Sequence, residues 1–177
     1  MQLQIKPYET PEEVTALRTL FEDYLKGIYW SENILGRIFL DLANHSRSKD
    51  ISLLLTQHAA NTKIHSDRLE KIFESIGIPA EEKQFDAMLG LMRDTEIILA
   101  QTTPGSVRDA AIIALVQHII HCGIASYGTL KSFAITLKEE NVVRLLDKSL
   151  EDEKDLDVKL SLVAEAYVND EAANKEI

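Results

Sequence analysis

Apolar residues recur every three or four positions along most of this chain, which is the spacing of one helix face. The pattern is clear from Val14 to Leu42 and returns after breaks near residues 48, 105 and 140. The 177 residues include only seven glycines and four prolines, whereas a β-sandwich or barrel needs a turn signal about every 8–12 residues. The sequence therefore predicts an all-α protein with one domain, 1–177.

Local capping signals divide the chain into five predicted helices. Segment 10–13 (TPEE) is a helix start, with Thr as N-cap, Pro at the first helical position and Glu closing a capping box. Gly77 followed by Pro79 ends the second helix, and Ser106 with Asp109 predicts a cap pair for the fourth. The predicted helices span about 11–43, 49–76, 81–102, 107–137 and 140–167, before a tail at 168–177 that we expect to fray.

The lengths of the connections predict how these helices are arranged. Short breaks join the first helix to the second and the last two to each other, which predicts two antiparallel hairpins. About 29 residues lie between the hairpins, and they include a helix that can travel about 30 Å. Two helical hairpins, joined by a long crossover that contains a short fifth helix, form a ferritin-like antiparallel four-helix bundle.

Charge and cysteine content narrow the range of partners. The net charge is −10 and the pI is near 5.0, whereas a nucleic-acid-binding protein normally shows a basic balance. The longest apolar run, 110–116, is far shorter than the roughly 18 residues of a membrane span, and residues 1–10 contain no apolar leader. The single cysteine, Cys122, suits a reducing compartment. We expect a cytoplasmic protein that binds neither nucleic acid nor a membrane.

Polar residues interrupt the apolar face of each long predicted helix near its middle. They are Glu32 in the first helix, His58, Asn61 or Thr62, and His65 in the second, Gln117 and His121 in the fourth, and Ser149, Glu153 and Asp157 in the last. A carboxylate without a partner in an apolar core costs several kcal/mol. We therefore expect these side chains to share a metal ion, a proton or water.

The hairpin turns predict which of these residues meet. If the first hairpin turns near residue 47, Glu32 lies about one turn from His65 along the bundle. If the second turns near residue 139, Asp157 lies level with His121, and Glu153 lies one turn away. This predicts one interior layer of Glu32, His65, Glu153 and Asp157, with His121 as a nearby alternative ligand.

Interpretations without a ligand stay open for individual residues. Glu32 could reach water or pair with Arg or Lys across the bundle, and any single interior histidine could be a hydrogen-bonded core residue. His45 and His118 fall off the apolar face and are expected on the surface. The acidic run 151–157 is mostly a solvated helix face, except for Glu153 and, in one interpretation, Asp157.

The chain resembles the YciE/YciF-like stress proteins of the ferritin-like superfamily over most of residues 14–167. The resemblance is carried, in order, by 25–35 (LKGIYWSENIL), 65–72 (HSDRLEKI), 85–91 (FDAMLGL), 124–130 (IASYGTL) and 150–160 (LEDEKDLDVKL). It implies a ferritin-like bundle in the bacterial cytoplasm that is associated with stress responses, is often dimeric and has no settled biochemical activity.

The resemblance also implies which residues could bind metal. Glu32 matches the glutamate of the first helix, Glu153 and Asp157 match the acidic pair of the last, and His65 stands where many members carry His or Gln. Asn61 stands where members often have Glu or Gln.

The fourth helix departs from the family pattern. Members typically read Val-Glu-His-Tyr-Glu-Ile-Ala, whereas residues 119–125 read IIHCGIA, so Ile120 and Gly123 replace two glutamates. A ferritin-type di-metal site takes carboxylates from all four helices. The resemblance therefore implies a di-metal site that is degenerate or absent.

Two functional hypotheses follow. The first is a stress-associated homodimeric bundle of unsettled biochemical activity, which we do not expect to be an enzyme. It would have a degenerate or absent di-metal site, with no cofactor or a weakly bound divalent metal (Fe, Mn or Zn). The alternative is a di-iron-carboxylate-type protein that binds Fe, Mn or Zn in oxidative stress or iron handling, with Glu32, His65, Glu153, Asp157 and His121 as candidate ligands. No P-loop, G-x-S-x-G or Gly-rich dinucleotide motif supports a hydrolase or a transferase.

Overall fold

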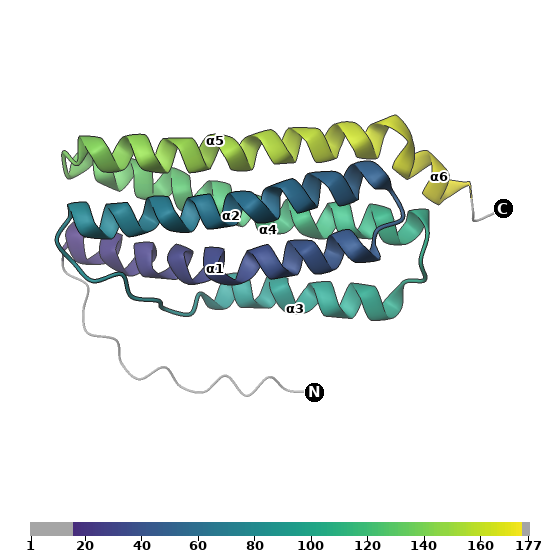
Figure 1. Ribbon diagram of the computed structural model, residues 1–177, viewed down its shortest axis with the longest axis horizontal. Helices are drawn as coiled ribbons and strands as arrows, with labels where there is room; N and C mark the ends of the chain where they lie inside the picture. Colours follow the sequence, from purple (N-terminus) through teal and green to yellow (C-terminus); the bar gives the residue numbers. More distant parts are fainter. Residues whose placement is uncertain (1–15, 175–177) are drawn as a thin grey trace.

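The computed structural model describes residues 16–174, in which the regular structure is all helical (Figure 1). Its helices are α1 (Leu17–His45), α2 (Lys49–Ser75), α3 (Asp86–Gln101), α4 (Ser106–Thr136) and α5 (Glu140–Val163), followed by the π-helical turn η1 (Ala164–Val168) and α6 (Asn169–Ala173). The predicted start of the first helix and its cap at 10–13 lie outside the described residues.

Two antiparallel hairpins form the bundle, as the sequence predicted. Residues 46–48 connect α1 to α2, and residues 137–139 connect α4 to α5. Between the hairpins, α3 runs back along the bundle beside α1 and α4, so that α2 and α4 point in the same direction (Figure 1). This single long crossover makes the fold a ferritin-like all-α bundle.

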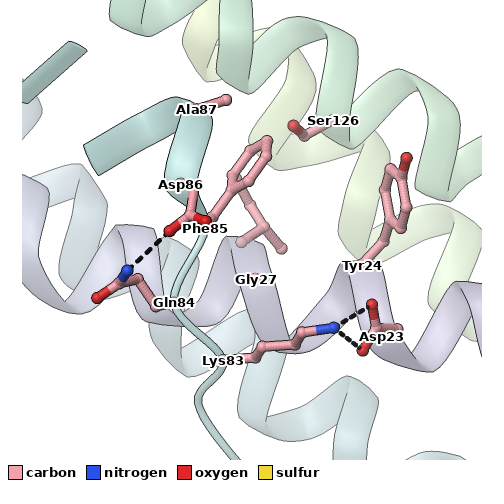
Figure 2. Close-up of a pocket in the computed structure, with 10 residues that line it drawn as sticks. Asp23, Tyr24, Gly27, Lys83, Gln84, Phe85, Asp86, Ala87 and Ser126 are labelled. Carbon is pink, nitrogen blue, oxygen red and sulfur yellow. Dashed lines mark hydrogen bonds and ion pairs between the residues drawn. The ribbon is translucent and has the colours of Figure 1, made fainter. Parts of the chain in front are cut away.

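The third helix begins at Asp86, five residues later than predicted, because the preceding loop bonds to α1 instead of to itself. The Lys83 ammonium lies 2.6 Å from both carboxylate oxygens of Asp23 (Figure 2), and the Lys83 amide donates to the carbonyl of Lys26. These contacts hold one wall of a surface pocket of about 400 Å³ between α1, the start of α3 and α4.

The last helix continues beyond its predicted end. The sequence predicted a fraying tail from residue 168, but η1 and α6 carry the helix to Ala173 and bury Val168. The Tyr167 hydroxyl donates to Asp50 on α2, and the Ser106 hydroxyl donates to the carbonyl of Glu171. The C-terminal turns therefore pack over the first turns of α2 and α4.

Ser106 and Asp109 do not cap α4 as predicted, since Gly105 stands at the N-cap. The buried Asp109 carboxylate instead accepts hydrogen bonds from the Ser46 hydroxyl and from the backbone amides of Arg47 and Ser48. It satisfies amides at the turn between α1 and α2, which have no intrahelical partner.

The core consists of two apolar clusters stacked along the bundle axis. One lies towards the turn between α1 and α2 and includes Leu35, Leu55, Ile120 and Leu156. The other lies towards the opposite end and includes Ile28, Leu69, Tyr127 and Leu150. Each of the four long helices therefore passes from one cluster to the other, and the residues at the crossing form a separate layer.

The helix α4 is apolar on more than one side. It is the helix among the described residues that is long and apolar enough, by length and composition alone, to cross a membrane. It packs against α1, α3 and α5, so that several of its faces are covered by protein. A helix with several packed faces shows little amphipathic contrast, and its inward face is hard to predict from sequence.

Candidate metal centre

The layer between the two apolar clusters contains four ionisable side chains. Glu32 comes from α1, His58 and His65 from α2, and Glu153 from α5. Their exposed fractions are 3%, 3%, 0% and 5%. Ionised groups are rarely buried to this extent without a partner of opposite charge.

These side chains face one another at short distances. His65 Nδ1 lies 3.2 Å from Glu32 Oε1 and 3.5 Å from Glu153 Oε1. His58 Nε2 lies 3.3 Å from the same Glu153 oxygen. One ligand atom each from Glu32, His65 and Glu153 lies within 4.8 Å of the others. The predicted pairing of Glu32 with His65 and Glu153 is therefore present in the fold.

Two atoms of this layer have no hydrogen-bond partner among residues 16–174. They are Glu32 Oε2 and His58 Nε2, because the approach of His58 to Glu153 is close but not aligned as a hydrogen bond. A buried polar atom that is left unsatisfied costs about 1–3 kcal/mol. Carboxylate and imidazole atoms that make no hydrogen bond, beside further carboxylate and imidazole groups, fit a divalent cation.

Further polar side chains surround the ligand set. The fully buried Tyr127 hydroxyl donates to Glu32 Oε1 at 2.7 Å. On the other side, Asp152 Oδ2 lies 3.2 Å from His65 Nε2 and 2.6 Å from Arg68 Nη1. The layer is thus connected to α4 through Tyr127 and to the bundle surface through Asp152.

The buried setting changes the pKa values of these groups. Burial and the neighbouring Glu32 raise the pKa of Glu153 above its ordinary value, although His58 and His65 act in the opposite direction. Burial would lower the pKa of His65, but Glu32, Glu153 and Asp152 together raise it above its ordinary value. Burial and the neighbouring Glu32 raise the pKa of Tyr127 well above its usual range, so the phenol keeps its proton and acts as a donor.

Asp157 and His121 lie outside this layer, contrary to the predicted interior placement. Asp157 Oδ1 contacts His121 Nε2 at 3.1 Å and accepts a hydrogen bond from Gln117, so these two residues do meet at the predicted level. Their side chains, however, are 22% and 63% exposed. The inward positions of this part of α4 belong to Ile120 and Gly123, and His121 is turned about 100° from Ile120.

The helix α4 contributes no carboxylate to the layer. Ile120 belongs to an apolar cluster, and a Cβ at position 123 would lie only 3.2 Å from Glu153 Oε2. Glu153 therefore occupies the space next to the backbone of Gly123. This arrangement leaves two carboxylates in the ligand set where two adjacent divalent cations need more.

Sequence reasoning left His58 out of its final ligand set and read Asp152 as part of a solvated acidic run. His58 could have been included, because it stands seven residues before His65 on the same helix face. Nothing in the sequence distinguished Asp152 from the other acidic residues of this run, since its contact with His65 depends on how α5 packs against α2. His45 and His118 are exposed, as predicted.

A bundle of two hairpins, a long crossover and a carboxylate–histidine layer at one interior level defines the class of ferritin-like proteins. The chain belongs to the YciF-like family described as a domain of unknown function (DUF892), whose pattern matches residues 16–173. This confirms the family resemblance predicted from the sequence.

Individual relatives agree with this assignment. Protein YciF of Escherichia coli (strain K12) is 32% identical over 160 residues, which cover 90% of this chain and 96% of that protein. The crystal structure of the E. coli stress protein YciF matches with a TM-score of 0.84 and 31% identity, over 88% of this chain and 98% of that one. YcfI from Rhodopseudomonas palustris, described as a candidate structural protein, matches with a TM-score of 0.82 and 28% identity, over 85% and 96% of the two chains.

Proposed function

We propose that this protein is a stress-associated bundle that binds one divalent transition-metal ion in its interior, in place of a metal pair. The ligands are Glu32, His58, His65 and Glu153. The observation that carries the proposal is the convergence of these four buried side chains, in which Glu32 Oε2 and His58 Nε2 make no hydrogen bond.

The chemistry of the donor set supports a single ion. Two carboxylates supply the negative charge that one divalent cation neutralises, and two imidazoles complete a set suited to Fe, Mn or Zn. A second cation would need carboxylates from α4, where Ile120 and Gly123 stand. The site is thus the degenerate form of a di-metal centre. A bound ion would supply a positive charge between the ligand residues of α1, α2 and α5.

The protein's own residues hold the ion in a dry environment. The two apolar clusters cover the layer from both ends and keep bulk water out. Tyr127 directs its proton to Glu32 Oε1, which leaves Oε2 free for the ion. We propose no enzymatic reaction, and the stress association comes from the name of the relative YciF.

A metal-free bundle is the second candidate, and one observation favours it. The pKa of His65 is raised, against the effect of burial, by Glu32, Glu153 and Asp152. An imidazolium at His65 would neutralise one carboxylate, and a proton on Glu153 would remove the other charge. In this case the protein would hold no metal, and its role would depend on its folded surface alone.

Melting curves separate the two candidates. The protein is purified without an affinity column and without chelator, then melted with EDTA and with added Zn(II), Mn(II) or Fe(II). We expect at least one metal to raise the melting temperature by several degrees, because a ligand that binds only the folded state stabilises it. Equal melting temperatures with EDTA and with every metal would refute metal binding and leave the metal-free bundle.

A further inference from the structure

An ion pair between Arg68 and Asp152, which we call the clamp, lies directly outside the proposed ligand set. Asp152 follows Ser149 by one helical turn on α5, and Arg68 follows His65 by one turn on α2. Arg68 Nη1 lies 2.6 Å from Asp152 Oδ2 and 3.2 Å from the Ser149 hydroxyl. The Arg68 guanidinium thus fixes the Asp152 carboxylate in the groove between α2 and α5.

The same Asp152 oxygen faces the ring of His65. Asp152 Oδ2 lies 3.2 Å from Nε2, while Nδ1 on the other side of the ring faces Glu32 and Glu153 at 3.2 and 3.5 Å. An ionised carboxylate only accepts hydrogen bonds, so the Nε2 side of the ring donates to Asp152. When a cation occupies the Nδ1 side, the single ring proton has one acceptor left, and that acceptor is Asp152.

The charge of Asp152 is secured by its neighbour. The Arg68 guanidinium pairs with Asp152 Oδ2 at 2.6 Å, so this carboxylate is held as a charged acceptor directly opposite His65 Nε2. Within residues 16–174, Arg68 bonds to Asp152 and Ser149 and to no ligand atom of the layer, so it acts on the His65 ring through Asp152.

We propose that Asp152, held by Arg68, is the positioning residue of the metal centre. It keeps the proton of His65 on Nε2 and orients Nδ1 towards the cation between Glu32 and Glu153. The inference rests on the proposed function, because it names what sets the affinity of the same site. Metal-ligating histidines generally donate their second nitrogen to such a partner, and loss of the partner lowers metal affinity about 10–100-fold.

The test measures the affinity for Zn(II) by competition with a chromophoric chelator, using the full chain. Asp152→Ala removes both the acceptor and its charge, and Asp152→Asn keeps an acceptor but removes the charge. Asp155→Asn is the matched control, since it makes the same charge change on the same helix at a side chain that is 62% exposed and pairs with Lys159. We expect binding to weaken about 10–100-fold in Asp152→Ala, to recover partly in Asp152→Asn and to change less than twofold in Asp155→Asn.

Arg68→Gln separates positioning from simple attraction. Removal of a positive charge near a cation site strengthens binding if only the charge matters. In the positioning mechanism the same change releases Asp152 and weakens binding several-fold. Melting of every variant in EDTA shows that the proteins are folded before their affinities are compared.

Nitrogen NMR of histidine-labelled, Zn(II)-loaded protein gives a readout that a purely structural role would not change. We expect metal-bound Nδ1 and protonated Nε2 at His65 in the wild type, and loss of the slowly exchanging Nε2 proton in Asp152→Ala. If the wild type binds none of Zn(II), Mn(II) and Fe(II), both the metal centre and the clamp are wrong. If it binds Zn(II) and Asp152→Ala binds as tightly as Asp155→Asn, or if Nε2 is the bound nitrogen, the clamp is wrong and the metal centre stands.

Discussion

Glu32 and His65 are 33 residues apart in the sequence, yet Glu32 Oε1 and His65 Nδ1 lie 3.2 Å apart inside the bundle. The short turn between α1 and α2 produces this contact, because it brings the middles of the two helices to the same level. The pair therefore lies where the two apolar clusters meet. Burial of the Glu32–His65 pair costs free energy unless a third group compensates its charge. Glu153 adds a second negative charge at the same level.

Replacement of either buried glutamate by leucine should separate stability from metal binding. In EDTA, we expect Glu153→Leu to be as stable as the wild type or more stable, because an apolar side chain removes a buried polar cost, whereas Glu32→Leu also loses the Tyr127 hydrogen bond and should be less stable by about 1.5–3 kcal/mol. With Zn(II), the variants should lose the gain in melting temperature that the wild type shows. Glu151→Leu on the exposed face of α5 is the control and should keep that gain. A loss of several kcal/mol for Glu153→Leu in EDTA would contradict this account of the layer.

The metal-free protein should lose stability as the pH rises above about 6.5. The pKa of His65 is raised in the folded state, since Glu32, Glu153 and Asp152 outweigh the effect of burial, so the folded state holds this proton more tightly. The resulting stabilisation is full below the unfolded-state pKa of about 6.5 and is lost as the pH passes the raised folded-state pKa. The raised pKa of Glu153, caused chiefly by burial, acts with the same sign from about pH 4.5 upwards.

Urea unfolding in EDTA between pH 5.5 and 8.5 measures this dependence. The free energy of unfolding of the wild type minus that of His65→Gln should decrease with pH, and His45→Gln, at an exposed histidine, should show no such trend. With Zn(II) the trend should reverse, because the cation competes with protons for the same ligands. A difference that grows with pH in EDTA would contradict the charge assignment of His65.

Gly123→Ala should behave differently from Gly128→Ala on the same helix. A Cβ at position 128 meets nothing within 4 Å, so alanine there should stabilise the protein by up to about 1 kcal/mol through helix propensity. A Cβ at position 123 would lie 3.2 Å from Glu153 Oε2 and displace that carboxylate by a few tenths of an ångström. We expect Gly123→Ala to gain less stability and to bind Zn(II) more weakly. Equal stability and unchanged affinity would show that Glu153 does not depend on this space.

Tyr127→Phe tests the hydrogen bond that supports Glu32. The phenol is fully buried and donates to a carboxylate, and such a bond contributes about 1.5–3 kcal/mol. We expect a loss of that size in urea unfolding with EDTA present. Tyr29→Phe, which removes an exposed hydrogen bond to Glu70, should stay within about 0.5 kcal/mol of the wild type. Similar small losses in both variants would contradict a structural role for the Tyr127 hydroxyl.

The fold was predictable because periodic apolar spacing and short turns determine how the hairpins pair. Glu32 and Glu153 were predictable as interior residues for the same reason, since each replaces an apolar residue on a clearly amphipathic helix. His121 was misplaced because α4 is apolar on several sides, so that its inward face carries no distinctive pattern.

Other features depend on contacts between segments distant in the sequence. The delayed start of α3 results from the bonds of Lys83 to α1, and the role of Asp109 depends on the turn before Ser48. Asp152 looks like any surface acid until α2 places His65 and Arg68 against it. Local propensity carries no information about such pairs, so only the assembled structure reveals them.

The metal-to-protein ratio tests the central claim most directly. The protein is loaded with excess Zn(II), Mn(II) or Fe(II), freed of unbound metal by gel filtration and analysed by inductively coupled plasma mass spectrometry alongside a Glu32→Leu, Glu153→Leu double variant. We expect one ion per chain in the wild type and none retained by the double variant, because the variant lacks both carboxylates of the ligand set. Two ions per chain, or none with any of the three metals, would contradict a single-metal centre built from Glu32, His58, His65 and Glu153.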